Sequence, residues 1–468
     1  MKVCKFGGTS LADAGQVRKV CDIVAADRQR RIVVVSAPGK RDKADAKVTD
    51  MLIRCAELRL AGREAREELH AIAARFEEIQ KGLGLSADVA VEIGLDLRAR
   101  SEQTALGRAA FLDLMKAAGE DNMAKLVAEA LTHRGLPADY VDPREAGMRL
   151  TEEHGNARLL PESYAELARL KGAKNIVVFP GFFGCTREGK VVTFSRGGSD
   201  ITGSILAAAV GAEVYENFTD VDSVFAVDPR IVPDAQPIDE LTFREMRELS
   251  YAGFSVLHDE AIIPAVAAGV PICIKNTNRP QGAGTRIVRE RRQQTHVVVG
   301  IASKDGFCTI NMNKFLMNRE IGFGRLLLQI VEDENLSYEH MPSGIDNVSI
   351  ILRSDDVDAA REERLVGRLE RELGCADIVV ERGLALIMLV GEGMRYAIGT
   401  AARATGALAG AGVNIEMLNQ GASEISMMYG VKESDRQRAV ESLYRAFFPE
   451  PAAGRRKGRP RATARRKP

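Results

Sequence analysis

The chain has 468 residues, a formal net charge of zero, 45% hydrophobic residues and 28% charged residues. This length favours two or three domains over a single core, and the composition excludes a disordered or fibrous protein. No run reaches the roughly 18 to 20 apolar residues that a membrane-spanning helix needs, and no apolar signal segment precedes the first strand. We therefore expect a cytoplasmic protein with no membrane partner.

The seven cysteines and six histidines are scattered, and no Cys-x-x-Cys pair occurs. This pattern is typical of reduced thiols and gives no support for a structural metal site. Residues 450–468 hold eight basic residues and one acidic residue, which leaves 57 basic and 64 acidic residues in the rest of the chain. We interpret residues 449–468 as a disordered basic tail. Weak contact with nucleic acid or an acidic partner is the less favoured alternative.

Short apolar runs alternate with amphipathic stretches over residues 1–292. The runs are rich in Val and Ile and several are continuous, which predicts strands of a sheet that is covered on both faces. The expected strands are 2–6, 32–36, 138–141, 175–180, 191–194, 214–218 and 272–275. The expected helices are 14–27, 49–60, 62–81, 87–119, 123–134, 162–170 and 201–210. This alternation predicts a three-layer α/β domain.

After residue 296 the pattern changes to two units with the order strand, helix, strand, strand, helix. The first unit, residues 304–382, has expected strands 307–312, 336–340, 347–352 and 377–380 and helices 322–334 and 357–373. The second, residues 383–448, has expected strands 384–390, 413–418 and 424–431 and helices 396–411 and 434–447. A period of about 75 residues indicates a pair of ferredoxin-like βαββαβ domains. An extra strand, 296–302, would complete the second of these ferredoxin-like domains, so that the first domain is inserted into the second.

A pair of glycines follows the first expected strand, in the segment from Lys5 to Ser10. Gly7 and Gly8 allow the backbone to approach a ligand, and their N–H groups suit phosphate oxygens. Lys5 adds a positive charge beside them. A simple tight turn is the alternative for this segment taken alone.

A second glycine pair, Gly197 and Gly198, opens the helix expected at 201–210. With Ser199 or Asp200 as the N-cap, this helix N-terminus predicts an anion site. Arg196 could bind a carboxylate through two parallel hydrogen bonds. A capped helix after a turn is the alternative. Polar residues at 219–222 and 225–230 also follow a strand, at the edge where α/β sheets bind ligands.

These clusters, in this order and spacing, resemble the amino acid kinase superfamily and in particular the aspartate kinases. The segments at 5–10, 181–182, 196–200 and 219–230 match the family's motifs, and the two terminal units resemble ACT domains. The resemblance covers residues 1–448. It implies ATP-dependent phosphorylation of L-aspartate to 4-phospho-L-aspartate, with Mg²⁺, as the first step toward lysine, threonine and methionine.

The resemblance also assigns roles to individual residues. The implied catalytic residues are Lys5, Gly8, Gly198 and Asp200. The implied substrate-binding residues are Thr49, Glu102, Phe182, Arg196 and Ser199. The implied nucleotide-binding residues are Lys5, Gly7, Gly8, Ser10, Thr219, Asp220, Phe225 and Arg230.

Two positions depart from the family pattern. Glu102 follows Ser101 where the family has a Gly-Glu pair, and Ser255 stands where many members have a second phosphate-side lysine. Arg230 is the expected substitute for that lysine. Two other readings stay open: a kinase for another amino acid such as acetylglutamate, and a catalytically silent amino-acid sensor.

The resemblance further implies regulation by lysine, threonine or both, through the first ACT unit. The expected effector residues are Met317, Asn318, Gly322, Glu339, Ser343, Asp346 and Asn347. The N–H groups at the start of the helix that follows Gly322 would bind the effector carboxylate, and Asp346 its ammonium group. We expect a homodimer or larger homo-oligomer, because ACT units pair along exposed sheet edges.

Overall fold

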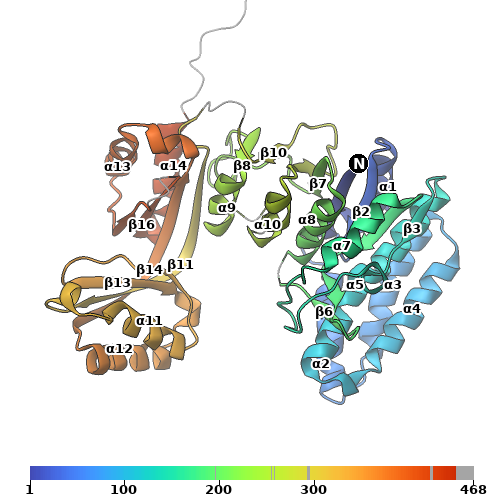
Figure 1. Cartoon of the computed structure of the whole chain (residues 1–468), viewed down its shortest axis with the longest axis horizontal. Coiled ribbons are helices and arrows are strands. Elements are labelled where there is room, and N and C mark those ends of the chain that lie inside the picture. The colour runs from blue at the N-terminus through green and yellow to red at the C-terminus, as the bar shows by residue number, and fades with distance from the viewer. Residues whose placement is uncertain (196, 255, 258, 292–295, 422–424, 449–468) are drawn as a thin grey trace, which may run out of the picture. The chain divides into compact units, whose positions relative to one another are not determined.

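The structure is a computed structural model that describes residues 1–448 except 196, 255, 258, 292–295 and 422–424. The chain forms two compact units, labelled by element in Figure 1. The first contains Met1–Ala226 and Pro237–Thr295, and the second contains Val227–Gln236 and His296–Pro468. Each unit is described by itself.

The first unit is built on an eight-stranded sheet with the order β3-β4-β2-β1-β7-β9-β10-β8. All neighbouring strands are parallel except β9 and β10, which are antiparallel. The strands are β1 (Lys2–Phe6), β2 (Arg30–Val35), β3 (Ala138–Tyr140), β4 (Ile176–Pro180), β7 (Val214–Thr219), β8 (Glu240–Thr242), β9 (Ile272–Asn276) and β10 (Thr285–Val288). A separate hairpin consists of β5 (Phe183–Cys185) and β6 (Val191–Thr193).

Helices cover both faces of this sheet, which confirms the three-layer α/β prediction (Figure 1). One face of β1 and β2 packs against α1 to α5 in a continuous apolar core, and the other packs against α8, which contacts Tyr215 closely. The helices are α1 (Ala14–Ala25), α2 (Val48–Leu60), α3 (Arg66–Leu83), α4 (Ala87–Ser101), α5 (Arg108–His133), α6 (Pro143–Ala146), α7 (Ser163–Leu167), α8 (Gly198–Val210), α9 (Phe243–Tyr251) and α10 (Asp259–Ala268).

The break between α4 and α5 lies elsewhere than the sequence predicts. The expected helix 87–119 ends at Ser101, and α5 then runs without interruption from Arg108 to His133. Gly107, whose φ is +85°, accounts for the break, since this backbone conformation suits glycine. Gly119 lies inside α5, where a Cβ would come within 2.7 Å of the Ala37 Cβ. Gly119 therefore permits a close approach and does not end a helix.

The second unit is a six-stranded antiparallel sheet with the order β12-β13-β11-β14-β16-β15 and four α-helices. The strands are β11 (Gly300–Asn313), β12 (Tyr338–His340), β13 (Asn347–Arg353), β14 (Ala376–Val390), β15 (Met417–Asn419) and β16 (Ser426–Lys432). The helices are α11 (Phe323–Asp333), α12 (Ala359–Leu373), α13 (Thr400–Gly410) and α14 (Arg436–Phe447).

Two long strands pass through both halves of this sheet. The first part of β11, from Gly300 to Lys304, pairs with the end of β14, and its later part pairs with the start of β14. The expected strands 296–302 and 307–312 are thus one strand, with an irregular register between Lys304 and Phe307. The later half of β14 lies between β16 and the beginning of β11. The beginning of β11 thus supplies the strand that completes the second ferredoxin-like domain.

A short segment of the chain between β7 and β8 belongs to the second unit. We call this segment, Val227–Gln236, the strap. The Gln236 N–H donates to the hydroxyl of Tyr444 on α14 over 2.9 Å. The base of the strap is closed by a bridge between Phe225 and Pro237. Among the described residues, no helix is both long and apolar enough to cross a bilayer.

Candidate active site

The candidate site lies where the parallel strands β1, β2, β4 and β7 end. Because these strands run in the same direction, their carboxyl ends share one edge of the sheet, where α/β folds place ligands. We call residues Gly7–Ala12, which follow β1, the first glycine loop. We call residues Ser36–Lys47, which follow β2, the second loop. The Gly39 N–H donates to the Gly8 carbonyl over 2.8 Å, so the two loops contact each other directly.

Lys5 and Asp200 form the charged centre of the site. Lys5 lies on β1, directly opposite Asn217 in the register with β7. Its Nζ lies 2.5 Å from Oδ1 of Asp200, and the two side chains are only 9% and 15% exposed. Asn217 donates to the same Oδ1 over 2.8 Å. The carboxylate of Asp200 therefore fixes the ammonium group at the sheet edge, in an environment that strengthens its field.

Steric limits hold the first glycine loop in one conformation. A Cβ on Gly8 would lie 2.9 Å from the Ala37 carbonyl oxygen and 3.2 Å from the Gly39 Cα. A Cβ on Gly7 would meet nothing nearer than 3.6 Å, the Lys5 Nζ. Gly8 is thus required for close contact between the two loops, whereas Gly7 has room for a methyl group.

The N-terminus of α8 packs against the loop after β4. Gly197, at φ +75°, is the N-cap residue of α8. Phe182 also has a positive φ, +76°, which is uncommon for a residue with a side chain. Its N–H donates to the Thr202 hydroxyl over 3.1 Å, and a Cβ on Gly198 would clash with its ring at 2.6 Å. Phe182, Gly198 and Ser199 are therefore held together around the helix N-terminus, a favourable place for an anion.

Glu120, which the sequence analysis overlooked, is the buried carboxyl group of the site. It lies on α5 and is 5% exposed, and its Oε2 has no hydrogen-bond partner among the described residues. Burial raises the pKa of Glu120 to about 8, while the Ala37 backbone N–H and the charge of Lys5 oppose the rise. An unpartnered buried carboxyl oxygen next to the second loop suits a ligand ammonium group.

Glu102, the substrate-binding glutamate that the sequence predicts, lies elsewhere in the first unit. It is the C-cap residue of α4, its side chain is 63% exposed, and its carboxylate lies 3.5 Å from Arg98. A Gly-Glu pair, which the resemblance leads one to expect near the substrate, occurs in the first unit as Gly119 and Glu120. The sequence signal existed, but a helix expected to end at Gly119 concealed it.

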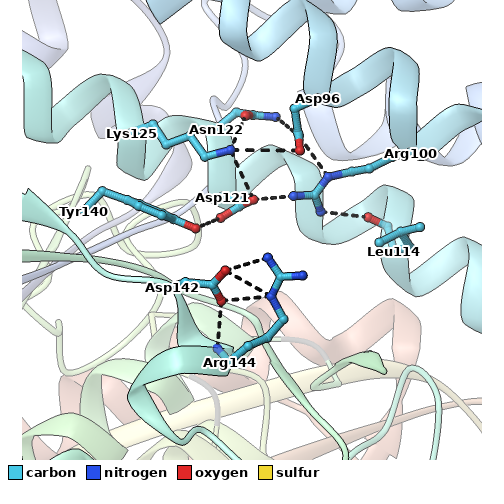
Figure 2. Close-up of polar contacts among 9 residues, drawn as sticks. All are labelled: Asp96, Arg100, Leu114, Asp121, Asn122, Lys125, Tyr140, Asp142 and Arg144. Carbon is cyan, nitrogen blue, oxygen red and sulfur yellow. Dashed lines mark hydrogen bonds and ion pairs between the residues drawn. The ribbon is translucent and has the colours of Figure 1, made fainter. Parts of the chain in front are cut away.

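A network of polar side chains holds α5 at Asp121, the residue that follows Glu120 in the sequence, and Figure 2 shows the contacts of Asp121. Asp121 accepts hydrogen bonds from Arg100 on α4 and from the Tyr140 hydroxyl, and Lys125 lies 3.6 Å from it. Arg100 also pairs with Asp96 over 2.9 Å. Successive residues of a helix point about 100° apart, so a fixed Asp121 also fixes the direction of Glu120.

The remaining predicted residues of the first unit lie either by the two loops or at and after the end of β7. Thr49 lies in the first turn of α2, directly after the second loop, and Ser10 is buried with its hydroxyl 2.7 Å from that of Thr277. Thr219 is the last residue of β7, and its hydroxyl donates to the carboxylate of Asp220, the next residue, over 3.2 Å. Phe225 is half-buried at the base of the strap.

Arg230 lies in the strap and thus in the second unit. Its guanidinium binds both carboxylate oxygens of Asp228, with Nη2 2.6 Å from Oδ2, and its side chain is 88% exposed. Arg230 lowers the pKa of Asp228 through this hydrogen bond. Arg196 and Ser255 lie outside the described residues. In the part of the chain that is described, no three His, Cys, Asp or Glu side chains cluster as metal ligands.

In the second unit, most of the expected effector residues gather around the loop before α11. Met317 and Asn318 begin a 3-10 turn, and the Asn318 N–H donates to the Ile345 carbonyl over 3.2 Å. Asp346 accepts from the Leu316 N–H over 2.7 Å. Gly322, at φ +89°, is the N-cap of α11. Ser343 pairs with Val348, Asn347 begins β13, and Glu339 lies on β12.

Comparison with known families identifies the family to which the chain belongs. The model of the amino acid kinase family matches residues 1–276, and an ACT domain model matches residues 387–447. The chain therefore belongs to the amino acid kinase family.

The relatives that match along the full length of the chain indicate its place within this family. Aspartokinase 3 of Bacillus subtilis (strain 168) is 54% identical over 448 residues, which cover 96% of this chain and 99% of that protein. The crystal structure of Clostridium acetobutylicum aspartate kinase has a TM-score of 0.85 at 36% identity, over 96% of this chain and 100% of that one. Within its family, the chain is thus one of the aspartokinases.

Aspartokinase III of E. coli is a more distant structural relative. Its complex with aspartate and ADP (R-state) has a TM-score of 0.78 at 28% identity, over 96% of this chain and 100% of that one. A second structure of it contains lysine and aspartate (T-state), with a TM-score of 0.77 at 27% identity, over 96% and 99%.

Proposed function

We propose that this chain transfers the γ-phosphoryl group of ATP to the side-chain carboxylate of L-aspartate, forming 4-phospho-L-aspartate. The observation that carries the proposal is the Lys5–Asp200 pair, which lies at the sheet edge beneath the glycine loops in a chain whose full-length relatives are aspartokinases.

The reaction needs positioning and charge more than proton transfer. A carboxylate with a pKa near 3.9 is ionised at neutral pH and attacks phosphorus without a general base. Lys5 would stabilise the charge that develops on the phosphoryl oxygens, while Asp200 and Asn217 hold its ammonium group. The N–H groups of Gly7, Gly8 and Gly198 would donate to the same oxygens. Thr219, Asp220 and Phe225 would line the nucleotide.

Aspartate would be recognised through its charged α-groups. Glu120 would bind the ammonium group, since a cation beside a buried carboxyl favours its ionised form. Arg196 would bind the α-carboxylate, with Thr49, Phe182 and Ser199 beside it. Arg230, bound to Asp228 in the strap, is a weaker candidate for the nucleotide side than the sequence predicted.

Mg²⁺ fits this site as an ion held mainly by the nucleotide. Protein sites for Mg²⁺ use one or two carboxylates together with phosphate oxygens and water. Asp220, which follows β7 at the edge of the sheet, would contribute the protein oxygen. When bound, the ion neutralises phosphate charge.

Regulation would occur in the second unit. We propose lysine as the first effector to test, on the basis of the lysine complex of the E. coli relative, and threonine as the alternative. The exposed side chains of Phe315, Ile321 and Ile345 around the expected effector site support homodimerisation there.

The test is product formation by the purified full-length chain. With ATP, Mg²⁺ and L-aspartate, hydroxylamine should trap an acyl phosphate as the hydroxamate, and acetylglutamate should give none. A chain that binds amino acids but gives no hydroxamate with aspartate would be a sensor, which would overturn the proposal. The intact Lys5–Asp200 pair argues against that reading.

A further inference from the structure

Arg75 is a buried cation that the proposed chemistry leaves without a role. It lies on α3, and its side chain is 4% exposed. Its neighbours on the same helix, Ile72 and Phe76, are fully buried in the apolar core. Burial of a guanidinium is costly unless its donors are satisfied. The partners of Arg75 therefore indicate what it does.

The guanidinium reaches three partners that all belong to the two loops of the active site. Nε donates to the Ala12 carbonyl over 3.3 Å, and Nη2 donates to the Gly39 carbonyl over 2.7 Å. Nη1 lies 2.8 Å from Oδ2 of Asp45. Ala12 ends the 3-10 turn of the first glycine loop, whereas Gly39 and Asp45 belong to the second loop. One side chain thus joins both loops to α3.

Gly39 connects Arg75 to the reacting region. Its carbonyl accepts from Arg75 while its N–H donates to the Gly8 carbonyl over 2.8 Å. The contact is tight, because a Cβ on Gly39 would lie 2.6 Å from the Gly8 carbonyl carbon. A shift of the Gly39 peptide would therefore move Gly8, whose N–H we assign to the phosphoryl oxygens.

Asp45 is held in its charged form on the other side of the guanidinium. Arg41 donates to it from its backbone N–H over 2.9 Å and from Nε over 3.0 Å. These bonds from Arg41, together with the ion pair with Arg75, lower the pKa of Asp45 below its usual value. Arg41 is 40% exposed in its side chain and pairs with Asp45 and Glu78.

We propose that Arg75 is a positioning residue for phosphoryl transfer, which acts through Gly39 to hold Gly8 in its reactive geometry. This inference rests on the proposed function. It requires the planar fork of arginine, because a lysine cannot donate along three fixed directions at once. A purely structural role would lower stability and leave the kinetics of the folded enzyme unchanged.

The experiment compares Arg75→Lys with the matched control Arg66→Lys, an arginine of the same helix whose side chain is 85% exposed and pairs with Glu64. Thermal unfolding, kcat and KM for each substrate are measured on the full chain by hydroxamate formation. A misplaced donor costs about 10- to 100-fold in rate, so we expect kcat of Arg75→Lys to fall by at least about tenfold. The KM for aspartate should change by less than about twofold, as should the kcat of Arg66→Lys.

A folded Arg75→Lys enzyme with wild-type kcat and wild-type KM for ATP would overturn the inference. If this variant does not fold, Asp45→Asn decides: about a threefold fall in kcat at unchanged aspartate KM supports the inference, and wild-type kinetics overturns it. The wild type is assayed in parallel. A wild type that forms no phosphoaspartate overturns the proposed function and the inference with it, whereas an active wild type confines a failure to Arg75.

Discussion

The loops that precede α1 and α11 share one plan, a strand followed by a 3-10 turn and a helix, yet they are packed differently. In the first unit, β1 leads through Gly8–Leu11 into α1, and Ser10 and Leu11 are buried. In the second, β11 leads through Met317–Arg319 into α11, and the neighbouring Phe315 and Ile321 are 89% and 102% exposed.

This difference distinguishes a closely packed loop from one whose apolar side chains face solvent. The first glycine loop is held by Gly39, by Arg75 and by a lack of space at Gly8. The loop before α11 is held by hydrogen bonds to Asp346 and Ile345, and apolar side chains beside it face solvent. Preorganised donors suit catalysis, because no reorganisation is needed during the reaction. A looser loop suits regulation, because binding can shift its population of conformations.

The largest effect should come from the charged centre beside the first glycine loop. Lys5→Ala should lower kcat by about 10²-fold or more, since a preorganised charge at the phosphoryl group is worth several kcal/mol. The KM for aspartate should change little. Lys2→Ala, on the same strand but paired with Asp27, is the control and should retain activity. Near-normal turnover of Lys5→Ala would contradict its assigned role.

The two glycines of the first loop offer a sharper contrast. Gly8→Ala places a methyl group 2.9 Å from the Ala37 oxygen, so it should separate the loops and reduce kcat by about tenfold or more. Gly7→Ala has open space and should be much milder. Equal losses in both variants, measured with thermal unfolding as a check on folding, would show that close contact of the loops is not required.

The choice between two glutamates tests the structure against the sequence. Glu120→Gln should raise the KM for aspartate about tenfold, because the variant lacks the buried negative charge that would bind the ammonium group of aspartate. Glu102→Gln changes an exposed residue and should leave the KM unchanged. The reverse result would restore the sequence-based assignment.

For the loop before α11, paired substitutions at Asp346 distinguish binding of an effector from support of the loop. Asp346→Asn keeps an oxygen acceptor for the Leu316 N–H but removes the charge, while Asp346→Ala removes both. If Asp346 binds the effector ammonium, both should relieve lysine or threonine inhibition by about fivefold or more, with uninhibited activity near normal. Relief by Asp346→Ala alone would mean that the residue only braces the loop.

The smallest expected effect is a pH dependence of stability from Glu120. Its folded-state pKa of about 8 lies above its ordinary 4.5, so the folded protein holds a proton that the unfolded chain releases between these values. The stabilisation is complete below pH 4.5 and is lost as pH rises through about 8. Urea unfolding of the ligand-free wild type and Glu120→Gln should show this difference, and a constant gap between them would contradict it.

Local patterns were sufficient to predict most of the sheet and the place of Lys5 and Gly8 at the end of β1. The prediction of Ser199 or Asp200 as the N-cap of α8 was wrong, because the cap is Gly197, whose positive φ suits glycine. Continuous runs such as β1, β2 and β7 are short, apolar and bounded by polar residues, so each was predicted from its own residues. The short strands β8 and β10 were missed, because three or four residues carry little periodicity.

The errors arose where a residue's role depends on distant packing. Gly119 looked like a helix end, yet its meaning comes from Ala37, which lies far away in the sequence. The same error concealed Glu120. Arg230 was assigned to the nucleotide through the family resemblance and stays a prediction; the strap places this residue in the second unit. Such long-range contacts leave no periodic signal in the chain.

The strap also limits how the chain can be divided into separately expressed parts. Val227, Val232 and Ala235 are almost fully buried in a unit whose other residues begin only at His296. A kinase half that ends at Thr295 would retain these apolar side chains without Tyr444 and α14 to cover them. Exchange of regulatory halves between related enzymes would therefore have to exchange two separate stretches of sequence.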